Sequence, residues 1–174
     1  MDGNDFGRKV LAIAAIVDAS NHSISTYEQN QLNADFVKKA FGEETELSIV
    51  GPMGDTDFSV LKKYLQSLDE SSRISLDLSD ASVTEIPQEA LKNVNTIKTI
   101  KLPKTVRIIK RAAFYGCTNL NVLNLSELNS LVEIGESVFS NIALTGEVIL
   151  PSSKVSSAST YQLQYKYCCH VYQF

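Results

Sequence analysis

Apolar residues recur at a fixed spacing between residues 83 and 151. The pattern opens with Val83, Ile86, Ala90, Leu91, Val94, Ile97, Ile100 and Leu102. Each of these positions is apolar again 23 residues later, from Val106 to Leu125, and a third copy from Leu131 to Leu150 follows after 25 residues. Self-similarity at such a period predicts a solenoid, in which each copy forms one coil stacked on the next.

Within each copy the hydrophobic pattern changes from that of a strand to that of a turn. The pairs Ile100 and Leu102, and Leu123 and Leu125, are each separated by one residue, which is typical of a short strand. Residues 106–120 carry apolar side chains three and four apart, which predicts a short helical or 3₁₀ turn on the opposite side. We therefore expect an α/β fold, a short leucine-rich repeat solenoid with a parallel strand ladder and about 4 to 5 coils.

Residues 46–80 predict a longer first coil. Leu47 and Ile49 begin its strand, residues 51–54 form a turn, and residues 58–68 have the apolar spacing of a helix. The alternation within residues 74–78 predicts the next strand. The ladder then places one inward pair on each strand, and these pairs are Leu47 and Ile49, Leu76 and Leu78, Ile100 and Leu102, Leu123 and Leu125, and Val148 and Leu150.

Residues 1–45 predict a cap of two helices over the first coil. One apolar helical face runs from Val10 to Val17, and a second helix begins with the capping-box spacing of Ser25 and Glu28. Arg8-Lys9 before the apolar run also weakly imitates a secretory signal, which is the alternative for this segment. Residues 18–29 lack the glycine and the final glutamate of a calcium loop, so we expect no metal site.

The repeat carries further residues that resemble a known family. Leu102-Pro103, Ala113-Phe114 and Cys117 stand in the places typical of the BspA-like (Treponema pallidum type) bacterial leucine-rich repeat proteins. Residues 47–58 and 76–81 resemble the entry segment of such proteins. The resemblance covers residues from about 46 to 151, although the first copy has Leu91 and Val94, and the third has Ile142, in place of the family's Phe and Cys.

The resemblance implies a non-enzymatic protein of the bacterial cell surface or the secreted fraction, associated with adhesion to host matrix proteins or to other bacteria. Together with the patterning it divides the chain into a helical cap over residues 1–45, leucine-rich repeats over 46–151 and a C-terminal capping segment over 152–174.

The outward positions of the strand ladder are the first candidate binding surface. Side chains alternate between the two faces of a strand, so the residues between the inward pairs lie side by side on the solvent face. The candidate residues on this face are Ser48, Ser75, Asp77, Thr99, Lys101, Val122 and Asn124. Their mixture of small polar groups and both charges suits protein recognition, whereas the alternative is a merely solvated sheet face.

A run of cations is the second candidate surface. It consists of Lys98, Lys101, Lys104, Arg107, Lys110 and Arg111, with no acid among them. Such a run suits a sulfated glycan, a phosphate or an acidic partner. Because the cations alternate with apolar core positions, a solvated rim explains them equally well.

The cysteines and the aromatic C-terminus offer a structural alternative. Cys117 occupies an inward repeat position and is expected in the core, and Cys168-Cys169 before His170 is expected to pack in a terminal strand rather than to hold a metal. The tyrosines between Tyr161 and Phe174 would close the far end of the solenoid or contact a second subunit. This second hypothesis is a structural, self-associating domain.

Charge and motifs exclude several other functions. A net charge of −4 gives no general attraction to nucleic acid or to an anionic membrane. No apolar run reaches the length of about 20 residues that a membrane span needs. The two histidines lie near the ends of the chain and no phosphate loop is present, so we expect no catalysis and no cofactor.

Overall fold

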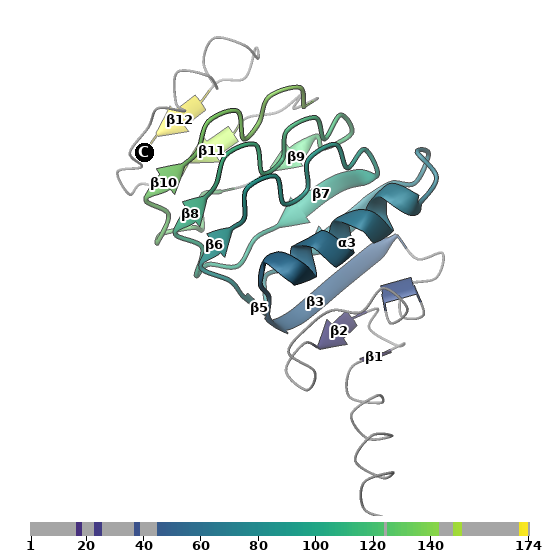
Figure 1. Cartoon of the computed structure of the whole chain (residues 1–174). Coiled ribbons are helices and arrows are strands. Elements are labelled where there is room, and N and C mark those ends of the chain that lie inside the picture. Colours follow the sequence, from purple (N-terminus) through teal and green to yellow (C-terminus); the bar gives the residue numbers. More distant parts are fainter. Residues whose placement is uncertain are drawn as a thin grey trace, which may run out of the picture.

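The structure is a computed structural model that describes residues 17–18, 23–25, 37–38, 45–123, 125–142, 148–150 and 171–173. Across these residues the chain forms stacked coils with short parallel strands on two sides, joined by turns (Figure 1). The predicted parallel strand ladder is therefore confirmed for its first four rungs, at Leu47, Leu76, Ile100 and Leu123. In this part of the chain no helix has the length and apolar character needed to cross a membrane.

The main sheet has the strand order β1-β2-β3-β4-β7-β9. These strands are β1 (Val17–Asp18), β2 (Ser23–Ser25), β3 (Glu46–Pro52), β4 (Ile74–Asp77), β7 (Ile97–Lys101) and β9 (Val122–Leu123). Leu47 pairs with Leu76, which pairs with Ile100, and all three are buried, as the inward positions predict. The strand β5 (Ala81–Ser82) pairs with the end of β3, so β3 runs on through Gly51, where a turn was expected.

A second ladder of three short strands stands on the other side of each coil (Figure 1). It consists of β6 (Glu85–Ile86), β8 (Ile108–Ile109) and β10 (Glu133–Ile134), all parallel. The helical or 3₁₀ turn predicted for residues 106–120 is confirmed only in part. The segment contains β8 and then a series of single turns closed by 3₁₀-type hydrogen bonds, but these turns do not join into a helix.

Residues with a left-handed backbone conformation interrupt these turns and prevent a continuous helix. Positive φ angles occur at Glu89, Asn93, Ala112, Gly116, Ser137 and Asn141. Some N–H groups bond within the turn, as Ala113 does to the carbonyl of Lys110 at 3.3 Å. The alternate N–H groups point to the next coil, and that of Ala112 bonds to the carbonyl of Glu136 at 2.9 Å. The turns therefore hold neighbouring coils together, which a helix with internal hydrogen bonds would not do.

The one long helix among the described residues, α3 (Asp55–Ser67), agrees with the prediction for this segment. It buries Phe58, Leu61 and Leu65 against the core and lies beside β3 (Figure 1). Its polar side chains bond to the first repeat coil, since Gln66 Nε2 donates to the carbonyl of Lys92 at 3.2 Å. One repeat later, the equivalent carbonyl is that of Tyr115, and it accepts the backbone N–H of Asn93 from the preceding coil. The side chain of Gln66 thus takes the place of a preceding coil, and α3 caps the ladder of turns.

The predicted two-helix cap over residues 1–45 is not shown. The described residues of this segment include β1 and β2, which lengthen the main sheet, and Val17 lies in β1 where a helix was expected. Val37 is helical and fully buried, in agreement with the second predicted helix. The remaining positions of both predicted helices lie outside the described residues.

The C-terminal strands form a separate pair. Strand β11 (Val148–Leu150) pairs in parallel with β12 (Val171–Gln173). Among the described residues no hydrogen-bonded pairing joins β11 to β9, so the fifth rung of the predicted ladder is not shown. A terminal strand within residues 165–174 was predicted and β12 agrees with it, whereas Cys168 and Cys169 lie outside the described residues.

The core between the two ladders is one continuous apolar cluster. The rings of Phe114 and Phe139, from adjacent coils, stack with centroids 6.0 Å apart. Cys117 is fully buried beside them, and its Sγ donates to the carbonyl of Leu91 at 3.0 Å, which confirms its predicted core position. Burial raises the pKa of this thiol to about 12, so the thiol stays protonated at neutral pH.

Candidate functional site

The solvent side of the main sheet carries two rows of polar side chains, which we call the strand face. One row pairs Ser48 with Asp77 and Asp77 with Lys101. The other row pairs Glu46 with Ser75 and Ser75 with Thr99. Both rows follow from alternation along β3, β4 and β7, because the intervening leucines and isoleucines point into the core.

The strand face is hollowed into a shallow groove of about 390 Å³. The groove is lined by Glu46, Leu47, Ser48, Ser75, Leu76, Asp77, Thr99 and Lys101. The lining combines small, half-buried side chains at Ser48, Ser75 and Thr99 with the longer, exposed side chains of Glu46 and Lys101. The groove is therefore the product of small residues on three adjacent strands.

One ion pair crosses the groove. Lys101 Nζ donates to Asp77 Oδ2 at 2.8 Å, and the backbone N–H of Ser79 donates to Asp77 Oδ1 at 2.9 Å. Burial opposes ionisation of Asp77, but these hydrogen bonds outweigh it, so the pKa of the carboxyl is lowered. The hydrogen bond to Asp77 and its negative charge raise the pKa of Lys101. Both groups are thus charged and already partnered over the neutral pH range.

The remaining polar groups of the groove are not committed in this way. Within the described part of the chain, the hydroxyls of Ser48, Ser75 and Thr99 make no hydrogen bond to another side chain or to the backbone. The Glu46 carboxylate forms no ion pair there either. No described residue therefore occupies these three hydroxyls or this carboxylate.

Val122 and Asn124 were also predicted to lie on this surface. Val122 pairs with Thr99, which places it on the row of Glu46 and Ser75. Asn124 lies outside the described residues.

The sequence prediction missed that the main sheet continues past β3 onto β2. Ser23 pairs with Ser48, and Ser25 pairs with Val50, so β2 adds one more strand to the main sheet beside β3. The only signal in the sequence was the alternation Ser23-Ile24-Ser25, which is too short to predict a strand by itself.

The repeat geometry agrees with a comparison against protein families. The model of the BspA type leucine-rich repeat region, in six copies, matches residues 68–172, which is more than half of the chain. The chain belongs to the BspA-type leucine-rich repeat family. The resemblance seen in the sequence is thus confirmed. A comparison with curated proteins found no match.

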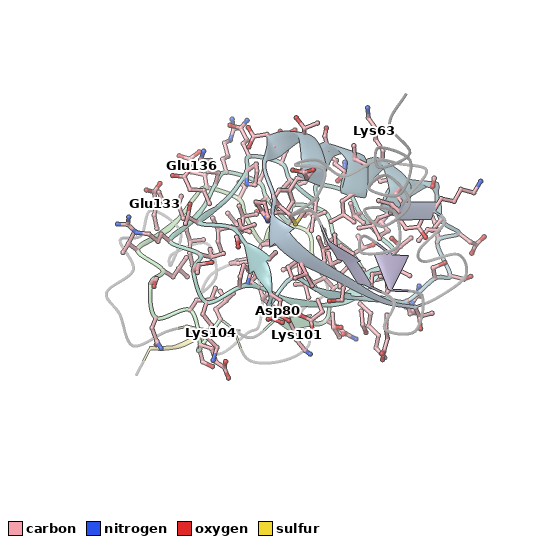
Figure 2. All side chains as sticks on the ribbon, turned by 90° about the horizontal axis from the view of Figure 1, so that it is seen from below. Lys63, Asp80, Lys101, Lys104, Glu133 and Glu136 are labelled. Atoms are coloured by element: carbon pink, nitrogen blue, oxygen red, sulfur yellow. The ribbon has the colours of Figure 1, made fainter. Side chains whose placement is uncertain are left out.

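The basic run of this BspA-type chain does not form a single patch. Lys98 and Lys101 belong to β7 in the main sheet, whereas Arg107 and Lys110 flank β8 in the second ladder. Lys98 is a bulge residue without an opposite residue in β4, because Ile74 pairs with Ile97 and Ser75 pairs with Thr99. The run therefore follows the coil around the molecule, and Figure 2 shows Lys101 and Lys104 on the side away from Lys63 of α3.

Half of the basic run is also neutralised by neighbouring coils. Lys104 bonds to Glu127 at 2.9 Å, Lys110 bonds to Glu85 at 2.7 Å, and Lys101 bonds to Asp77. Lys98, Arg107 and Arg111 form no ion pair with another described residue. These pairings favour the interpretation of the run as a solvated rim over that of a glycan site.

A second hollow of about 510 Å³ lies between α3 and the first repeat coil. Its cations are already engaged, since Lys62 Nζ donates to the carbonyl of Glu89 at 3.0 Å and Lys110 pairs with Glu85. This hollow is the seam where α3 caps the repeats, so we do not assign it a ligand.

Proposed function

We propose that this chain is a non-enzymatic binding module that recognises a protein partner through its strand face, in adhesion-type contacts. The observation that carries the proposal is the groove of about 390 Å³, where three adjacent strands present polar groups that have no partner among the described residues. Membership of a leucine-rich repeat family supports the proposal, because stacked repeats create extended binding surfaces.

The composition of the groove favours a protein over a glycan. Its lining has hydroxyls, two carboxylates and an ammonium group, but no aromatic ring on which a sugar would stack. The dispersal and pairing of the basic run remove support from sulfated-glycan binding. Self-association through the tyrosines of residues 161–174 concerns side chains outside the described residues.

The setting that we propose is the cell surface or the secreted fraction, which the BspA-type family suggests. The partners would then be host matrix proteins or surface proteins of other bacteria, and nucleic acid is not among them because the net charge is −4.

The test is the capture of the purified chain on an array of matrix proteins, bacterial surface proteins and sulfated glycans, at low and high salt. The variant Thr99→Trp fills the groove with a bulky neutral side chain. The matched control is Thr84→Trp, which makes the same change at an exposed threonine beside the second ladder.

We expect a hit on a protein that persists at high salt, is lost with Thr99→Trp and is retained with Thr84→Trp. Equal capture of both variants would show that the strand face is not the recognition surface. Binding to sulfated glycans alone, lost at high salt, would transfer the function to the cations of residues 98–111.

A further inference from the structure

We infer that the groove of the strand face receives an arginine side chain of the protein partner, an inference that rests on the proposed function. The first argument is charge. The groove contains Glu46, Asp77 and Lys101, and the last two neutralise each other at 2.8 Å. The carboxylate of Glu46 is thus the one charge in the groove without a partner among the described residues.

Neither lysine of β7 pairs with the Glu46 carboxylate. Lys98 is exposed on β7, but it does not line the groove. Lys101 senses Glu46 electrostatically, yet its ammonium is bonded to Asp77. A cation from the partner would therefore find a carboxylate that no described residue of the chain pairs with.

The second argument is the hydrogen-bonding capacity of the groove. Ser75 lies directly across from Glu46 on the adjacent strand, about 5 Å away, and Ser48 follows two residues along β3, about 7 Å away. Both hydroxyls are half-buried and accept hydrogen bonds. A carboxylate with two nearby hydroxyls matches a group that only donates and donates in several directions.

Guanidinium meets this description better than ammonium does. It carries five N–H donors in a planar fork and pairs with a carboxylate through two parallel hydrogen bonds, while its remaining donors reach neighbouring acceptors. Ammonium is a strongly hydrated point charge with three donors. The apolar stem of the arginine would pass over the small side chain of Thr99, which leaves room for it.

The experiment titrates the full chain with N-acetyl-arginine amide and follows backbone amide signals by nuclear magnetic resonance. N-acetyl-citrulline amide, which has nearly the same shape without the charge, and N-acetyl-lysine amide are the comparison probes. We expect the arginine probe to shift the amides of Ser48, Ser75 and Thr99, and both comparison probes to bind more weakly.

The variant Glu46→Gln keeps the size of the side chain and removes its charge. It should weaken binding of the arginine probe about tenfold, which corresponds to about 1.4 kcal/mol. Glu133→Gln makes the same change at an exposed glutamate of β10, on the second ladder, and should leave binding unchanged.

Equal shifts with arginine and citrulline, or equal affinity of wild type and Glu46→Gln, would overturn the inference. Equal affinity for lysine would overturn the assignment of guanidinium. If Thr99→Trp abolishes protein capture while the arginine probe causes no shift, the proposed function stands and the arginine inference fails. If the arginine probe binds but Thr99→Trp leaves protein capture intact, the proposed function fails instead.

Discussion

Replacing Gly135 with alanine should destabilise the fold strongly, although it adds only one methyl group. Gly135 follows β10, and its N–H donates to the carbonyl of Ile109 in the preceding coil at 2.7 Å. A Cβ at this position would lie 2.6 Å from the backbone nitrogen of Arg111 and 2.9 Å from the carbonyl carbon of Lys110. Because the obstacles are backbone atoms, the two coils must separate to admit the methyl group.

The magnitude follows from three terms. Overpacking against backbone costs about 1 to 3 kcal/mol, and weakening the hydrogen bond to Ile109 costs about 1 kcal/mol more. Alanine restricts the unfolded chain relative to glycine, which offsets about 0.4 to 1 kcal/mol. The three terms give a net loss of about 1 to 3.6 kcal/mol in the free energy of unfolding, or a Tm lower by roughly 2 to 14 °C.

The assay is urea unfolding followed by circular dichroism, with Gly54→Ala as the control. A Cβ on Gly54 would lie 3.9 Å from the nearest atom, Asp57 Oδ2, and its φ of −120° suits alanine. This variant should lose no more than about 1 kcal/mol, from the helix N-cap preference. A Gly135→Ala protein as stable as Gly54→Ala would refute the close approach of the coils after β10.

Four further predictions concern the core, the groove and the turns. Leu123→Asp places a charge at a position that is 3% exposed, so circular dichroism should show no cooperative thermal transition. Lys101→Met should cost no more than about 1 kcal/mol at pH 7. The pKa of Asp77 is lowered in the folded state, so the stability difference between wild type and Lys101→Met should shrink below pH about 3.9. It should vanish once the pH is below the lowered pKa, as measured by urea unfolding at a series of pH values. Cys117, with a pKa of about 12, should resist alkylation at pH 8 until urea unfolds the chain, as read by mass spectrometry of its peptide. Gly116→Asn should be tolerated better than Gly116→Val in thermal melts, because φ is +71° there and asparagine adopts positive φ more readily.

The inward half of the ladder was predictable because burial leaves a direct trace in the sequence. Leu47, Leu76 and Ile100 stand in one register because each is the apolar member of an alternating strand, and a slip by one residue would expose all of them. The same alternation predicts the outward positions of Ser48, Asp77 and Lys101. Their pairing follows from the register, but their role in binding stays a prediction.

The turn side of the repeat was not predictable in the same way. Apolar residues three and four apart suit a 3₁₀ helix and a series of turns equally. The turns depend on positive φ at Glu89, Ala112 and Ser137, and none of these residues is a glycine that would signal it. Strand β2 was missed because its three residues form a strand through pairing with β1 and β3, which the local sequence does not reveal.

The central claim is that a protein partner contacts the strand face. The most direct measurement replaces Thr99 or, in a parallel sample, Thr84 with a photoreactive benzoyl-phenylalanine and irradiates the full chain together with the protein that it captures. We predict a cross-linked complex from position 99 and none from position 84, which lies beside the second ladder. A cross-link from position 84 with none from position 99 would contradict the account and move the recognition surface to the opposite side of the coils.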